Sequence, residues 1–291
     1  MGAFLAKTFV ILVLIAAVFG GAAYFTYQLF IKPKEQLEAE RTAPATPLPP
    51  DPALPEFNKA LSVLKTGDLL AARDAFGRFV DQNPRSQKLE EAKDYLGKIN
   101  TDIFLSPKPA PEKQLYVVRS GDVLNKVARH TKTTPELLMR ANGLSNIMLQ
   151  INQQLLYTPT EFTVVIRKKE QKVVVLNHGK FFKHYAIRKM YGAATPKKPG
   201  ATPYPKQAGK VAEKIAWGPS GGRVIFTDKE YQSATFWVSF TVAGHTLYGE
   251  PDAGSAEQAN KPPVGGIGLA PGDVKELATM LTRGCPVTIE S

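Results

Sequence analysis

The sequence predicts a multidomain chain with an N-terminal transmembrane helix, a small all-α unit, a short βααβ domain and a mainly-β C-terminal domain. An uncharged apolar run near the N-terminus and two proline-rich joints, at 33–55 and 106–113, support this division. Between the joints, apolar residues repeat at helical spacing, and past the second joint strand signals dominate. The 291 residues are enough for more than one buried core. We therefore expect an anchor at 1–32, a linker at 33–55 and folded regions at 56–105, 114–160 and 161–291.

Composition narrows the classes of partner and site. The net charge of +11 favours anionic partners such as anionic lipid or an acidic wall polymer. No run of five basic residues and no nucleic-acid-binding motif occurs, so nucleic acid is not an expected partner. The single cysteine, Cys285, excludes an intramolecular disulfide and a zinc site built on several thiolates. The four histidines lack metal-ligand spacing, so neither a metal site nor a cofactor is predicted.

Residues 8–31 predict a membrane anchor. The segment has 24 residues without a charge, and a helix of that length rises about 36 Å, against a hydrocarbon core of about 30 Å. A cleaved signal peptide is the alternative, with an apolar core at 8–19 and cleavage after residues 21–23. The apolar run continues past that point, which favours an uncleaved anchor. Basic residues flank both ends, so they do not fix the orientation. The following 33–55 segment carries seven prolines and predicts an extended spacer.

Residues 56–105 predict three amphipathic helices. Phe57, Ala60, Leu61 and Leu64 follow i, i+3, i+4, i+7 spacing. Gly67-Asp68 and Asn83-Pro84 interrupt the pattern, which restarts after each break. This arrangement resembles one tetratricopeptide-type repeat with a following helix. The resemblance implies a protein-interaction or dimerisation unit with a candidate protein partner. The alternative is a helical spacer, since one repeat buries little core alone.

Residues 114–159 predict the order strand, turn, helix, helix, strand. Ser120-Gly121-Asp122 provides a turn and an N-cap for the first helix. Thr134 is the expected N-cap of the second, with Pro135 at its first position. Asn142-Gly143 predicts a left-handed end to that helix.

The segments YVVRSGDVL, ANGL and INQQLL of this region resemble the LysM family. Asn152 stands where the family usually has glycine, and asparagine also tolerates the left-handed conformation. The resemblance implies binding of N-acetylglucosamine-containing glycan, chiefly peptidoglycan or chitin, in a groove between two loops. Those loops correspond here to Gly121, Asp122, Val123, Leu124 and Asn125, and to Met148, Leu149, Gln150 and Ile151.

Physical chemistry makes these loops suitable for a sugar chain. Backbone amides and carbonyls can bond the N-acetyl group, and Leu124, Leu149 and Ile151 can offer apolar surface to the acetyl methyl and the sugar face. Few polar side chains are needed, so weak affinity is expected. The alternative is that the loops only close the fold.

Residues 161–291 predict a mainly-β domain with one helix. Strand signals lie at 163–166, 172–176, 183–187, 237–241, 246–248 and 286–290, and the helix is expected at 273–281 after a Gly272-Asp273 cap. The segments WVSFTVAGHTLYGEPDAG and PVGGIGLAPGDVKELATMLTRGCPVTI resemble the L,D-transpeptidase catalytic domain, also called the YkuD fold. That resemblance implies remodelling of peptidoglycan peptides through a cysteine thioester.

The residues at the family's catalytic positions differ from its motifs. In the alignment with the family, Tyr248 takes the position of the histidine in I-H-G-T. On S-H-G-C-I-R, Val264 takes the place of the base, Gly266 that of the nucleophile and Gly268 that of the arginine. Cys285 follows roughly twenty residues after the nucleophile position, at the start of the closing strand, where a small buried apolar side chain is expected. We therefore predict a degenerate domain, a pseudoenzyme with no catalytic residue.

Together these features predict a bacterial cell-envelope protein. It would cross the inner membrane once, with the bulk of the chain periplasmic or extracytoplasmic, and its partners would be peptidoglycan and the cytoplasmic membrane. Two alternatives stay open. One is an active L,D-transpeptidase-type enzyme that uses Cys285 or another nucleophile, and the other is a protein-interaction scaffold built on the helical unit.

Overall fold

The structure is a computed structural model that describes residues 51–191, 207–242, 245–250 and 266–290, together with Lys32 and Lys34. The expected anchor and most of the expected linker lie outside these residues. Among the helices of the described part, none has the length and apolar character needed to cross a bilayer. Residues 51–291 form one compact unit, separate from residues 1–50.

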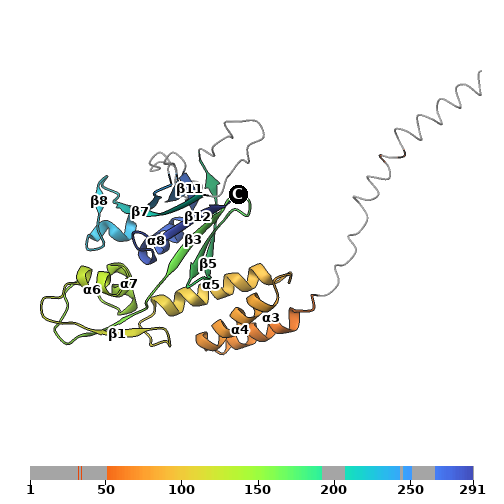
Figure 1. The fold of residues 1–291 in the computed structure, drawn as a ribbon, viewed down its shortest axis with the longest axis horizontal. Helices are drawn as coiled ribbons and strands as arrows, with labels where there is room; N and C mark the ends of the chain where they lie inside the picture. Colours follow the sequence, from red (N-terminus) through yellow and green to blue (C-terminus); the bar gives the residue numbers. More distant parts are fainter. Residues whose placement is uncertain are drawn as a thin grey trace, which may run out of the picture. The chain divides into compact units, whose positions relative to one another are not determined.

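Three helices occupy the first part of this unit: α3 (Leu54–Lys65), α4 (Leu69–Gln82) and α5 (Leu89–Leu105) (Figure 1). Asp68 caps α4 by accepting a hydrogen bond of 3.0 Å from the amide of Ala71. Phe57, Phe76 and Phe79 are fully buried, and the ring of Phe57 meets the other two edge-on at 6.0 and 5.6 Å. The aromatic spacing seen in the sequence therefore builds a small helical core.

The βααβ region follows. Strand β1 (Gln114–Val117) pairs antiparallel with β2 (Gln154–Tyr157), and α6 (Leu124–His130) and α7 (Pro135–Ala141) lie between them in sequence. As predicted, Thr134 caps α7, accepting from the amide of Leu137 at 3.1 Å. Gly143 and Asn152 both have positive φ, 60° and 70°. The expected cap of α6 is wrong: its N-cap is Val123 and no side chain caps it, because the Asp122 carboxylate accepts from the Tyr116 hydroxyl and the Arg119 amide instead of from the first amides of the helix.

The C-terminal region is a strongly curved sheet. Its strands are β3 (Phe162–Arg167), β4 (Lys172–Asn177), β5 (Lys180–Ala186), β6 (Lys189–Met190), β7 (Gln207–Trp217), β8 (Arg223–Val224), β9 (Thr235–Phe240), β10 (Thr246–Gly249), β11 (Gly266–Leu269) and β12 (Pro286–Glu290). In the described residues the hydrogen-bonded order is β5-β4-β3-β12-β7-β9-β10-β11-β6, with β8 beside β7. Only β3 with β12 and β10 with β11 pair in parallel.

Helix α8 (Pro271–Met280) packs Val274, Leu277 and Met280 into the core of this sheet, and a short 3-10 helix, η2 (Lys229–Ser233), precedes β9. The helix begins two residues earlier than expected, at Pro271, with Ala270 as N-cap. Proline is favoured in the first helical turn because its missing N–H would have no partner there. Asp273 lies inside the first turn instead of before it.

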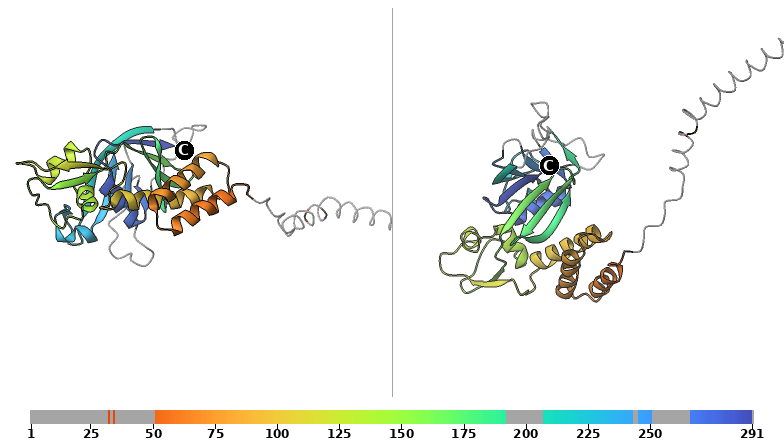
Figure 2. Two further views of the ribbon diagram at one scale, coloured as in Figure 1. Left: turned by 90° about the horizontal axis from the view of Figure 1, so that it is seen from below. Right: turned by 45° about the vertical axis from the view of Figure 1, so that its right-hand side comes forward.

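The helical unit, the βααβ region and the C-terminal sheet pack directly against one another. Helix α5 lies along β5 (Figures 1 and 2), and a Cβ on Gly97 would come within 2.9 Å of the Lys183 side chain. Glu276 of α8 accepts hydrogen bonds from Lys183 at 2.6 Å and from the Tyr185 hydroxyl at 2.7 Å. In the βααβ region, the Thr134 hydroxyl donates to the carbonyl of Thr279 on α8.

Candidate functional site

The first predicted glycan loop, residues 121–125, has a mixed surface. Gly121 takes a positive φ of 77° and is exposed, and Val123 is 60% exposed. Leu124 is only 3% exposed and packs in the βααβ core with Val127 and Leu138. The expectation that its side chain offers apolar surface to a sugar is therefore wrong, because the first turn of α6 points it inward. Val123 presents the apolar surface on this loop.

Asp122 organises the turn before α6. Its carboxylate accepts from the Arg119 amide at 2.9 Å and the Tyr116 hydroxyl at 2.7 Å, and it pairs with Lys126 at 3.2 Å. These hydrogen bonds, the Arg119 amide first, lower the pKa of Asp122 to about 2. Asp122 thus holds the loop in place with an ionised side chain.

The second predicted loop is more open. Met148 is 81% and Ile151 64% exposed, whereas Leu149 packs against the βααβ core. The amide of Gln150 donates to the Gln153 side chain at 3.0 Å, which stabilises the turn. Residues 143–146, 148 and 150–153 surround a hollow of about 470 Å³. Ile147, also exposed, adds apolar surface that the sequence reasoning missed, although Ile147-Met148 is an apolar pair in a polar loop.

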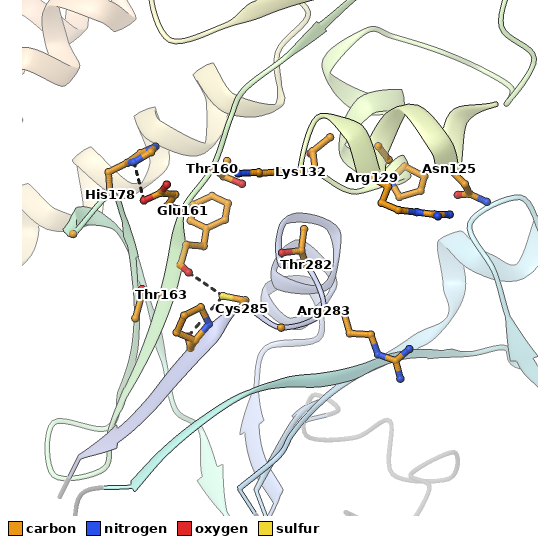
Figure 3. A pocket seen from close by; sticks show the side chains of 17 residues that line it. Asn125, Arg129, Lys132, Thr160, Glu161, Thr163, His178, Thr282, Arg283 and Cys285 are labelled. Atoms are coloured by element: carbon orange, nitrogen blue, oxygen red, sulfur yellow. Dashed lines mark hydrogen bonds and ion pairs between the residues drawn. The ribbon is translucent and has the colours of Figure 1, made fainter. Parts of the chain in front are cut away.

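The structure therefore brings only some of the predicted residues together. Met148, Gln150 and Ile151 border one hollow, and Leu124 and Leu149 share the core beneath the loops. Asn125 lies elsewhere, on the wall of a larger cavity of about 970 Å³ between α6 and the C-terminal sheet (Figure 3). The sequence does not reveal that cavity, because residues 282–286 of its wall lie more than 100 residues along the chain from the rest of the lining.

The transpeptidase-like positions lie on two adjacent strands. Strands β10 and β11 run in parallel, with Tyr248 opposite Gly268 and Thr246 opposite Gly266. The two segments that the sequence assigned to separate motifs are thus neighbours. Val264, at the base position, lies outside the described residues.

Tyr248 has its own hydrogen-bond partners at this place. It is 5% exposed, and its hydroxyl donates to Glu250, which also accepts from the Tyr191 hydroxyl at 3.3 Å. Burial, followed by the bond to Glu250, raises the pKa of Tyr248. Lys189 sits 4.7 Å over the Tyr191 ring and 3.9 Å from Glu250. A Cβ on Gly268 would lie 3.0 Å from both the Tyr248 hydroxyl and Glu250. This network fills the space beside the strand pair.

Cys285 is buried, as predicted for a small apolar position. It is 5% exposed, and its Sγ donates to the carbonyl of Phe162 at 3.1 Å (Figure 3). Burial raises the pKa of the thiol to about 12, so the reactive thiolate is disfavoured.

His245 contacts Lys168, with 3.0 Å between Nε2 and Nζ. Within the described ranges, no group of three or more His, Cys, Asp or Glu side chains could hold a metal ion.

Comparisons with known proteins bear on two regions. The LysM domain family model matches residues 116–157. A search of curated protein sequences found no match. Similar solved structures are L,D-transpeptidases, and they cover about half of the chain. An enzyme from Mycobacterium smegmatis shares 16% identity over 49% of this chain and 65% of its own, with a TM-score of 0.30. One from Stackebrandtia nassauensis shares 22% over 45% and 56%, with a TM-score of 0.29.

The catalytic domain of the Enterococcus faecium enzyme shares 17% identity over 44% of this chain and 96% of its own, with a TM-score of 0.26. This chain thus spans less than two thirds of the M. smegmatis and S. nassauensis proteins.

Proposed function

We propose that this chain is a bacterial cell-envelope protein that binds the N-acetylglucosamine-containing glycan of peptidoglycan through its LysM domain. One observation carries the proposal. In the region that matches LysM, the two loops assigned to the groove expose aliphatic side chains, Val123 on one and Met148 and Ile151 on the other. Met148 and Ile151 border one hollow, and neighbouring apolar side chains in water are costly unless a ligand covers them. Acetyl methyls and sugar faces fit such a surface.

The N-terminal residues extend this proposal to the membrane. Residues 8–31 would anchor the chain in the cytoplasmic membrane, with the remainder on the extracytoplasmic side. The proline-rich 33–55 segment could then span about 70 Å at about 3.1 Å per residue. A net charge of +11 suits both an anionic membrane and a polymer that carries carboxylates.

The C-terminal region, in this proposal, binds or positions and does not catalyse. Its support is chemical: Tyr248, Gly266 and Gly268 supply neither a thiol nor an imidazole, and the thiol of Cys285 is buried with a raised pKa. The helical unit already uses one side of α5 to contact β5. A protein partner of that unit would therefore bind α3 and α4.

Co-sedimentation of the full-length chain with purified peptidoglycan sacculi tests the glycan site. We expect the chain to pellet with sacculi, and Val123→Asp and Ile151→Asp to abolish pelleting. Leu115→Asp is the matched control, because Leu115 is an equally exposed aliphatic residue that belongs to neither loop and lies on β1 opposite Leu156. Loss of pelleting in the control alone, or pelleting unchanged by the loop variants, would contradict the proposal.

A further inference from the structure

The cavity of about 970 Å³ is a second recess beside the LysM loops. One wall is α6 with the turn that follows it, and the other is formed by residues 160–163, 178–179 and 282–286 of the C-terminal region (Figure 3). Its volume lies at the upper end of the range for ligand sites. Tyr248, Glu250, Gly266 and Gly268 are not among its lining residues, so it is distinct from the β10–β11 strand pair.

Positive charge dominates the lining. It contains Arg129, Lys132 and Arg283, against one carboxylate, Glu161, which pairs with His178 at 3.5 Å. Arg283 is anchored by its Nε, which donates to the Ala212 carbonyl at 2.7 Å, and Figure 3 shows its guanidinium on the far side from Lys132. In the described part of the chain, Arg129 and Lys132 form no ion pair. These two exposed cations are therefore available to an anion.

Hydroxyl groups complete the wall. Thr160, Thr163 and Thr282 line the cavity beside the cations (Figure 3). Thr133, which follows Lys132, is more than nine-tenths buried, and its Oγ1 has no hydrogen-bond partner among the described residues. A buried polar atom left unpaired is uncommon and marks a place where a partner is missing. Cationic and hydroxyl donors together suit a carboxylate.

The cavity also adjoins the proposed glycan loop. Asn125 belongs to the first loop and lines the cavity. Helix α6 leads from Asn125 to Arg129, and Lys132 lies in the turn just after the helix. A glycan strand held at the loop would therefore carry its substituents along this helix. We infer that the cavity binds a carboxylate-bearing substituent of the glycan strand, an acidic peptide, with Arg129 and Lys132 as its contacts. The inference rests on the proposed glycan binding and adds the acidic partner.

The test compares two soluble probes on the full-length chain. One is a disaccharide-peptide fragment of peptidoglycan, and the other is a chitin oligomer, which has N-acetylglucosamine but no carboxylate. We expect the fragment to bind about tenfold more tightly, as one charge-assisted hydrogen bond would give. Arg129→Glu/Lys132→Glu should remove this advantage and leave chitin binding unchanged. Arg78→Glu/Lys98→Glu is the matched control, with the same charge change on exposed residues of α4 and α5.

Each outcome bears on the inference. Equal binding of the two probes, or an advantage that survives Arg129→Glu/Lys132→Glu, overturns it. Competition by inorganic phosphate also overturns it, if phosphate at the same concentration as the fragment removes the fragment's tighter binding. Such a result would mean that the cavity binds anions in general. A fragment with amidated carboxyls should bind like chitin. If chitin fails to bind but the fragment binds through Arg129 and Lys132, the inference stands and the proposed glycan site fails.

Discussion

The LysM loops and the β10–β11 strand pair both correspond to functional segments of the families they resemble, yet their side chains are in opposite states. The loops expose Val123, Met148 and Ile151 to solvent. The strand pair buries Tyr248, closes its hydroxyl onto Glu250 and leaves only a tight fit for a Cβ at Gly268. One region presents surface that a ligand could cover, and the other satisfies its polar groups internally. Binding should therefore be sought at the loops and not at the strand pair.

The largest predicted effect concerns Cys285. A reactive thiol there would contradict the conclusion that the C-terminal region keeps its polar groups buried and satisfied. Burial raises its pKa from 9.0 to about 12, so its thiolate population at neutral pH falls about a thousandfold. We expect a thiol reagent to label the folded chain about a thousandfold more slowly than the denatured chain at the same pH. Labelling rates measured with and without denaturant test this.

The same experiment has a clear contrary result. Native labelling within about tenfold of the denatured rate would mean that the thiol is reachable and ionised. The C-terminal region would then hold a usable nucleophile, which would favour the alternative of an active L,D-transpeptidase-type enzyme.

The next effect separates two neighbours in one loop. Leu124→Asp places a charge in the βααβ core and should lower the free energy of unfolding by about 3–5 kcal/mol. Val123→Asp changes an exposed residue at the N-cap of α6, where Asp is favoured, so it should not lower the free energy of unfolding while it removes glycan binding. Urea unfolding measures both. Equal destabilisation by the two variants would mean that Val123 is not a surface residue. The first loop would then offer no exposed aliphatic side chain to a ligand.

A smaller effect tests whether the strand pair is filled. Gly268→Ala should cost about 1–3 kcal/mol, since its Cβ would press on the Tyr248 hydroxyl and Glu250. Tyr248→Phe removes that hydroxyl, so the double variant should cost less than the sum of the single ones. Gly272→Ala is the control, because nothing lies within 4 Å of its Cβ position. Additive costs in the cycle would show that the network does not fill the space.

Local signals in the sequence predicted much of the fold. The helical periodicity around Phe57 and Phe76, the Thr134-Pro135 cap and the left-handed Asn152 all depend on residues close in the chain, and the structure contains each of them. The expected helices differ from the structure at their ends, as at α6 and α8, where capping choices compete. Two strands of the C-terminal sheet, β7 and β11, were not expected at all.

The candidate site was harder to predict, because its side-chain directions are set by tertiary packing. Leu124 and Val123 are adjacent aliphatic residues, and only the docking of α6 decides which one faces water. The cavity joins Lys132 to Thr282, and its existence depends on Thr134 and Leu137 packing on the C-terminal region. Nothing in the spacing of single residues encodes that contact.

The smallest effect concerns the loop's own scaffold. The pKa of Asp122 falls from 3.8 to about 2 on folding, so its folded value lies below its unfolded one. Its contribution to stability is therefore fully present above about pH 4 and is lost as the pH falls towards 2. Asp122→Asn should lower the unfolding midpoint in urea at neutral pH, and the difference from wild type should vanish near pH 2. Asp74→Asn, at an exposed carboxylate of α4, is the control and should change neither value.

The effect of Asp122→Asn on stability and binding also tests how rigid the first loop, residues 121–125, is before it meets a ligand. If Asp122→Asn also weakens binding to sacculi at neutral pH while Val123 stays intact, the loop must be held in shape before it meets the glycan, which reduces the entropy lost on binding. If stability falls but binding does not, the glycan itself orders the loop. If neither changes, the hydrogen bonds to Arg119 and Tyr116 contribute nothing to the folded state, and the loop must owe its shape to Leu124 and the core alone.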